Sequence, residues 1–130
     1  MIINRSIDVE EAIRSSLGEY MQTYVKPLPK NFSVPSVEIS AVGGSEVDKI
    51  DTFDVTLDSR AQHEAEAYEN LRNAIGIVQE IAKSQTTALR WVEINSLGSW
   101  GKDPVRPDLA MCSARLRVIA HVETVEVQKL

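Results

Sequence analysis

Four aspartates in the middle of this 130-residue chain are the first candidates for metal chemistry. Asp48, Asp51, Asp54 and Asp58 supply the hard oxygen ligands that calcium and magnesium prefer. Their spacing does not match the EF-hand loop, and the alternation of a strand would direct them to both of its faces. We therefore interpret them as part of a solvated strand face and predict no metal site.

Histidine, cysteine and serine offer no catalytic pattern. His63 and His121 lie in different predicted elements and outside motifs such as HExxH, so we interpret both as surface residues. The single cysteine, Cys112, excludes an internal disulfide, fits a reducing compartment, and alternates with apolar residues as a small core side chain would. No serine stands in a GxSxG context, and Gly43-Gly44 lacks the phosphate-loop motif and is interpreted as a turn. We predict no enzyme and no cofactor.

One segment remains that suggests binding. Residues 98–108 are rich in glycine and proline, which predicts a long loop, and loops of this length are often functional. Within it, Trp100 has Lys102 and Arg106 nearby. An aromatic ring with basic neighbours could stack on a base or fill a pocket of a partner protein. The alternative is a tryptophan that packs back on its own core.

The elements that would position these residues follow from apolar spacing. Apolar residues at intervals of three and four predict a first helix over Val9–Tyr24, with Asp8 and Glu11 as a capping box. Three prolines make residues 26–35 an irregular connector. A second, longer helix is predicted from about Ala61 to Ala82, with Ser59 and Gln62 as its capping box.

Alternation of apolar and polar residues predicts four strands, at residues 37–41, 50–58, 89–97 and 112–122. Gly43-Gly44 would end the first strand, and residues 43–49 would close a hairpin. This order predicts an α+β fold, in which a four-stranded, mainly antiparallel sheet carries the N-terminal helix and the long central helix on one face. With 43% hydrophobic residues, residues 1–130 should form a single domain.

Charge and hydropathy exclude other classes. The net charge of −5 does not support attraction to nucleic-acid phosphates. Residues 46–80 hold nine acids and three bases, net −6, whereas residues 81–130 hold five acids and seven bases, net +2. These surfaces could meet between copies of the chain, or they could simply be different solvated faces. Neither a signal peptide nor a membrane span is expected.

Several stretches, taken in their order along the chain, carry a resemblance to a known family. They are Ile7–Arg14 at the start of the first helix, the strand pair broken by Gly43-Gly44, residues 65–75 on the long helix, and an Arg-Pro loop before the last strand. In this order they resemble the tail-terminator or tail-completion proteins of long-tailed phages and prophages, a family also described as minor capsid or head-tail joining proteins. Arg106-Pro107 departs from the family pattern, which commonly has an aromatic residue beside the arginine.

The resemblance implies a structural protein at the head-tail junction of a virion, assembled in the cytoplasm of a bacterial host. Such proteins form a ring, often a homohexamer, that caps the tail tube. The implied partners are further copies of the chain, the major tail tube protein and the head-tail connector protein. DNA would pass through the lumen without sequence-specific binding, and no membrane would be involved.

On this hypothesis two groups of residues make the contacts. The long loop would contribute an intersubunit or axial contact through Trp100, Lys102, Asp103 and Arg106. In the last strand, Arg115 and Arg117 would pair with the acidic strand of a neighbouring copy. One alternative is a head-closure or connector protein, and another is a small, dimeric, ligand-binding regulatory module. A pocket lined by convergent polar groups would favour the module.

Overall fold

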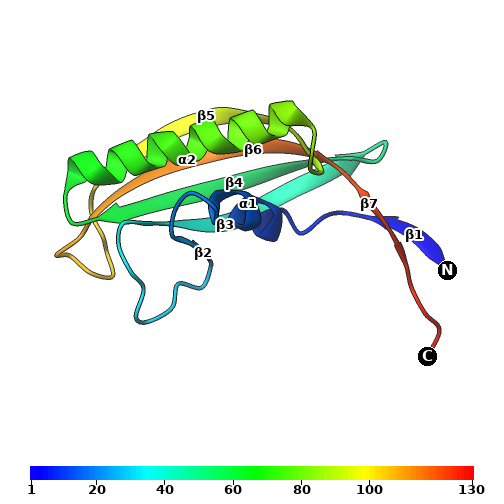
Figure 1. Cartoon of the computed structure of the whole chain (residues 1–130), viewed down its shortest axis with the longest axis horizontal. Coiled ribbons are helices and arrows are strands. Elements are labelled where there is room, and N and C mark those ends of the chain that lie inside the picture. Colours follow the sequence, from blue (N-terminus) through cyan, green and yellow to red (C-terminus); the bar gives the residue numbers. More distant parts are fainter.

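The structure is a computed structural model that describes residues 1–130, apart from the side chain of Ser99. It contains two helices, α1 (Val9–Leu17) and α2 (Glu64–Ser84). The strands are β1 (Ile2–Arg5), β2 (Thr23–Val25), β3 (Ser36–Val47), β4 (Ile50–Ala61), β5 (Leu89–Lys102), β6 (Ala110–His121) and β7 (Glu123–Glu126). Figure 1 shows α2 lying along the main sheet, and β1 and β7 leaving it together as a narrow ribbon.

The α+β class is confirmed, but the main sheet has five strands in the order β2-β3-β4-β6-β5. The four predicted strands are present and antiparallel to their neighbours. The fifth strand, β2, pairs in parallel with Val37–Ile39 of β3. A second sheet consists of β1 and β7, which pair antiparallel.

A single apolar core lies between the helices and one face of the sheet. Alternate residues of β4, such as Val55 and Leu57, are fully buried and pack with Leu71 of α2 and Ile13 of α1. Both helices therefore cover the same face, as predicted, and α1 also packs against α2. The intervening β4 residues, including Asp54, point to the other face.

The first helix begins where predicted but ends at Leu17 instead of Tyr24. The backbone N–H of Glu11 donates to Asp8 Oδ1 at 3.1 Å, which confirms the predicted cap. After Gly18 the chain turns, and Thr23–Val25 forms β2. The apolar spacing continued beyond Leu17 because Met21 also packs against the core, from a turn and not from a helix.

The predicted start of the long helix was wrong. Ser59 and Ala61 belong to β4, whose pairing with β6 continues to Ala61–Ala110, and α2 begins only at Glu64. Ser59 Oγ donates instead to the carbonyl oxygen of Ala67 at 2.8 Å. The pairing with β6 therefore takes up residues that, by local pattern alone, resemble a capping box.

Two glycines that were interpreted as turn or loop residues lie inside strands. A Cβ atom on Gly44 would lie 2.5 Å from the carbonyl oxygen of Thr52, and one on Gly98 would lie 2.4 Å from that of Ser113. Both positions require glycine because a neighbouring strand approaches closely. Consequently β3 runs through Gly43-Gly44 to Val47, with a bulge between Ala41 and Gly43, and β5 runs on to Lys102.

Candidate functional site

The predicted contact loop is shorter than expected, because Trp100 and Lys102 are part of β5 and only residues 103–109 remain as a loop. The structure keeps Lys102, Asp103 and Arg106 near one another at this end of the sheet. Arg115 and Arg117 lie farther along β6, where they are exposed. The six predicted residues therefore form more than one group.

Asp103 belongs to a buried charge cluster. Its Oδ2 atom lies 2.8 Å from Nε of Arg60, and Nη1 of Arg60 lies 2.8 Å from Oε1 of Glu38. Asp103 is completely buried and only 5% of Arg60 is exposed. Asp103 Oδ1 also accepts a hydrogen bond from the backbone N–H of Val105 at 3.0 Å. The prediction that Asp103 contacts another subunit is therefore not supported, because a buried acid is not available to a partner.

The two acids of this cluster also determine the direction in which the pKa of Arg60 is shifted. Burial by itself lowers the pKa of Arg60, but hydrogen bonds and charge interactions with Glu38 and Asp103 outweigh it, so its pKa lies above the ordinary value. Arg60 is therefore a fixed cation that joins β3, β4 and the 103–109 loop. Its role is structural, since both acids already bind it.

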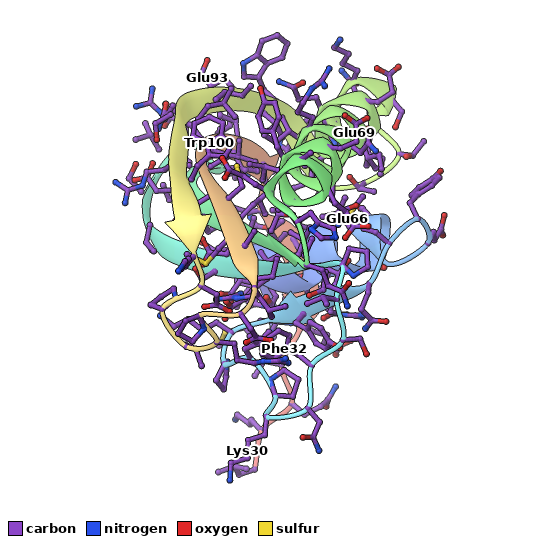
Figure 2. The ribbon with its side chains drawn as sticks, turned by 90° about the vertical axis from the view of Figure 1, so that its left-hand side faces the viewer. Lys30, Phe32, Glu66, Glu69, Glu93 and Trp100 are labelled. Carbon is purple, nitrogen blue, oxygen red and sulfur yellow. The ribbon has the colours of Figure 1, made fainter. Side chains whose placement is uncertain are left out.

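Next to this cluster, the connector and the loop form a cleft of about 500 Å³. Two guanidinium groups lie close to the ring of Phe32, with Arg60 Cζ 5.8 Å and Arg106 Cζ 5.5 Å from its centroid. Lys26 and Lys30 stand on the rim, and Figure 2 shows Lys30 at the outer end of the connector. The cleft is a place where a small anionic group could bind.

Trp100 lies on the edge of the sheet and not in a loop. Its ring contacts Tyr68 of α2, with a centroid distance of 5.3 Å, and 44% of the residue remains exposed. Figure 2 shows it between β5 and α2. Three more large side chains of β5 are about half exposed. Ile94 and Leu97 pair in register with core-face residues of β6, as Trp100 does, whereas Trp91 pairs with Ile119 on the other face of the same edge strand. We call these four residues the β5 strip. Trp100 packs in part on its own helix, as one interpretation expected, and its exposed part leaves contact with a partner as a prediction.

Arg115 and Arg117 extend from the sheet face opposite the helices. Nη1 of Arg117 lies 3.5 Å from Oε1 of Glu93 in β5, and Arg117 is the cross-strand neighbour of Asp54 in β4. Arg115 has no ion-pair partner among the described residues. This face therefore presents one engaged and one available arginine.

Among the side chains that the structure describes, no group of three or more potential ligands is placed to hold a metal ion. Cys112 is fully buried in β6, where desolvation, aided by the charge of Glu64, raises the pKa of its thiol. Neither helix, in the described part of the chain, has the length and apolarity of a membrane span.

Several residues of interest were missed by sequence reasoning. Arg60 and Glu38 were not singled out, because the residues around Arg60, Ser59-Arg60-Ala61-Gln62, give no local sign of a buried ion pair. Phe32 was overlooked because it lies in a proline-rich connector, where no periodic pattern draws attention to it. Trp91 was read only as the start of a strand, although both tryptophans of the chain fall on β5.

The fold and these sites define a small α+β protein with a half-covered sheet, an apolar edge strand and a basic-rimmed cleft. No protein-family model matches the chain, and no curated protein matches it either.

Proposed function

We propose that this chain is a self-assembling structural subunit, specifically a ring-forming tail terminator that caps the tail tube of a long-tailed phage or prophage. The observation that carries the proposal is the β5 strip: both tryptophans of the chain lie half exposed on the long edge strand of the sheet. Exposed edge strands with large apolar side chains aggregate unless a partner covers them. Tryptophan is also enriched among the residues that dominate binding energy at interfaces.

Two further features support the proposal. On the sheet face opposite the helices, Arg115 is exposed and has no ion-pair partner among the described residues, so it is available to an acid of a neighbouring copy. The resemblance described from the sequence motivates the choice of a terminator, and it implies the tail tube protein and the head-tail connector protein as further partners. The proposed place of action is the head-tail junction of the virion.

The direct test is the solution mass of the purified protein by light scattering over a concentration series, followed by negative-stain imaging. A mass near six subunits with annular particles is the expected result. Binding of the particles to purified tail tubes, in preference to head-side connectors, would separate a terminator from a head-closure protein. A protein that stays monomeric both alone and with tail tubes would contradict the proposal.

The cleft beside Phe32 favours a second candidate, a small ligand-binding module. Lys26, Lys30 and Arg106 line it, and a few polar groups around a concave site are the kind of lining that gives a ligand site its specificity. A screen of small anionic ligands by thermal shift tests this function. A discrete dimer whose melting temperature rises with one ligand would favour the module over the ring.

A further inference from the structure

The main sheet has two free edges, on opposite sides. At one side β5 pairs only with β6. At the other side β2 covers β3 only at Val37–Ile39, and Glu10 of α1 accepts a hydrogen bond from the backbone N–H of Ala41 at 2.9 Å. The rest of β3 has no neighbouring strand there, and its edge is free from Val42 to Val47. Residues 40–47 and the start of β4 form a hairpin, residues 40–54, which we call the acidic hairpin. Free edges of this length normally require protection or a partner.

Both edges expose apolar side chains. On one side lies the β5 strip, and on the acidic hairpin the exposed large residues are Val42, Val47 and Ile50. Apolar groups on two separate edges can be removed from water together if one edge packs on the other in a neighbouring copy.

The charges on the two edges are opposite. The acidic hairpin holds four acids, Glu46, Asp48, Asp51 and Asp54, and one base, Lys49, which gives a net −3. The edge strand β5 and its neighbour β6 together hold four bases, Arg90, Lys102, Arg115 and Arg117, and one acid, Glu93, which gives a net +3. Arg117 is already paired with Glu93, and Arg90 donates to backbone carbonyl groups, so Lys102 and Arg115 are the bases available to a neighbour. Complementary charge of this kind steers association and fixes register.

The acidic hairpin contains a buried carboxylate that lacks a hydrogen-bond partner. Asp51 is only 2% exposed, and its Oδ2 atom has no hydrogen-bond partner among the described residues. It lines a hollow of about 390 Å³ together with Glu46, Ser6 and Phe53. A desolvated carboxylate without a partner is costly, and such a group in a folded protein calls for a missing partner. The ammonium or guanidinium group of a basic side chain has the charge and the donors to satisfy it.

We infer that the acidic hairpin of one copy packs against the β5 strip of the next copy, with a basic side chain of the β5–β6 edge entering the hollow at Asp51. This inference rests on the proposed self-assembly and names its contact. Because the two surfaces lie on opposite edges of one sheet, the contact is head-to-tail. Head-to-tail contacts repeat from copy to copy and close into a ring when the rotation allows it.

A charge swap tests this pairing. One variant combines Glu46→Lys with Asp48→Lys on the hairpin, and the other combines Lys102→Glu with Arg115→Glu on the opposite edge. Each variant alone should assemble at least tenfold more weakly than the wild type, because like charges then face each other. An equal mixture should recover assembly, since each contact in an alternating ring again joins opposite charges.

Two matched controls carry the same changes of charge elsewhere. They are Lys26→Glu with Lys30→Glu at the connector, and Glu64→Lys with Glu66→Lys at the start of α2, all exposed positions. Both controls should assemble like the wild type. If the controls abolish assembly and the hairpin variants do not, the contact is at the connector end and the inference is wrong.

Asp51→Asn tests the hollow. The variant should remain folded by circular dichroism, with a melting temperature no lower than that of the wild type, while assembly weakens at least tenfold. If Ca²⁺ alone raises the melting temperature of the wild type and not of the variant, the hollow takes a free ion and not a side chain. Rings that persist in the charge-swap variants would overturn this contact and leave the proposed function standing, whereas a wild type without rings, alone and on tubes, would overturn both.

Discussion

Asp103 Oδ2 lies 2.8 Å from Nε of Arg60, in a fully buried contact between residues 43 positions apart. Further hydrogen bonds from the same residue hold the loop: the backbone N–H of Asp103 donates to the carbonyl oxygen of Leu109 at 2.9 Å. The 103–109 loop is therefore fixed to the end of the sheet by one acid. The shape of this loop therefore depends on the buried ion pair between Asp103 and Arg60, which solvent screens only weakly.

Replacing Asp103 by Asn should lower the free energy of unfolding by about 3 kcal/mol, because Arg60 would lose one of its two buried counter-charges. Urea denaturation followed by fluorescence measures the change. Asp108→Asn is the control, since Asp108 makes an exposed ion pair with Arg106 in the same loop and should change stability very little. Equal effects of the two substitutions would contradict the role given to Asp103.

Replacing Trp100 by Ala should weaken assembly while the monomer stays folded. Trp100 is half exposed, so truncation removes partner contact at the cost of one aromatic contact with Tyr68, about 1 kcal/mol. Light scattering and circular dichroism on the same sample report the two effects. Tyr20→Ala removes another exposed aromatic outside the β5 strip and should leave the mass unchanged. Unaltered ring formation by the Trp100 variant would count against the strip.

Gly98→Ala should destabilise the protein by about 1–3 kcal/mol, because the added Cβ would meet the carbonyl oxygen of Ser113 at 2.4 Å. Gly76→Ala offers the opposite case. It lies within α2, its Cβ would meet nothing within 4 Å, and alanine should add about 1 kcal/mol of helix propensity. Thermal melts of both variants check the contrast in sign.

Cys112 should react slowly with thiol reagents in the folded protein. Burial raises the pKa of its thiol, so less thiolate is present at pH 8 than for a free cysteine, and access is also blocked. The rate with a chromogenic disulfide reagent should rise by orders of magnitude on denaturation. A rapid reaction in native buffer would place Cys112 outside the core.

Local pattern predicted best where one face of an element is buried. The alternation in β4 and β6 was predicted correctly because the helices cover one side of each strand, and the Asp8 cap could be predicted because it is local. The limits of β3 and β5 were missed because Gly44 and Gly98 were interpreted as turn and loop residues, whereas each is required by the close approach of the next strand. Short segments such as β2 carry too few residues for any period to appear.

The candidate contacts were predictable only in part. Trp100 was identified by its chemistry, yet its place on an edge strand depends on pairing with Cys112, which a single local segment does not specify. Asp103 was correctly placed in a loop, but its burial was not predicted because its partner Arg60 lies in β4, 43 residues earlier in the chain. Such charge pairs depend on topology, and local propensity contains no information on them.

The β1–β7 ribbon determines how the molecule responds to a pulling force applied at its outer end. Ile2 pairs with Glu126 and Arg5 with Glu123, so the two strands run antiparallel away from the main sheet (Figure 1). Tension applied between residues 2 and 126 would open these pairs one after another, as a zipper does, instead of shearing them all at once. The ribbon should therefore yield at low force and act as a compliant tether, while the five-stranded sheet stays intact under the same load.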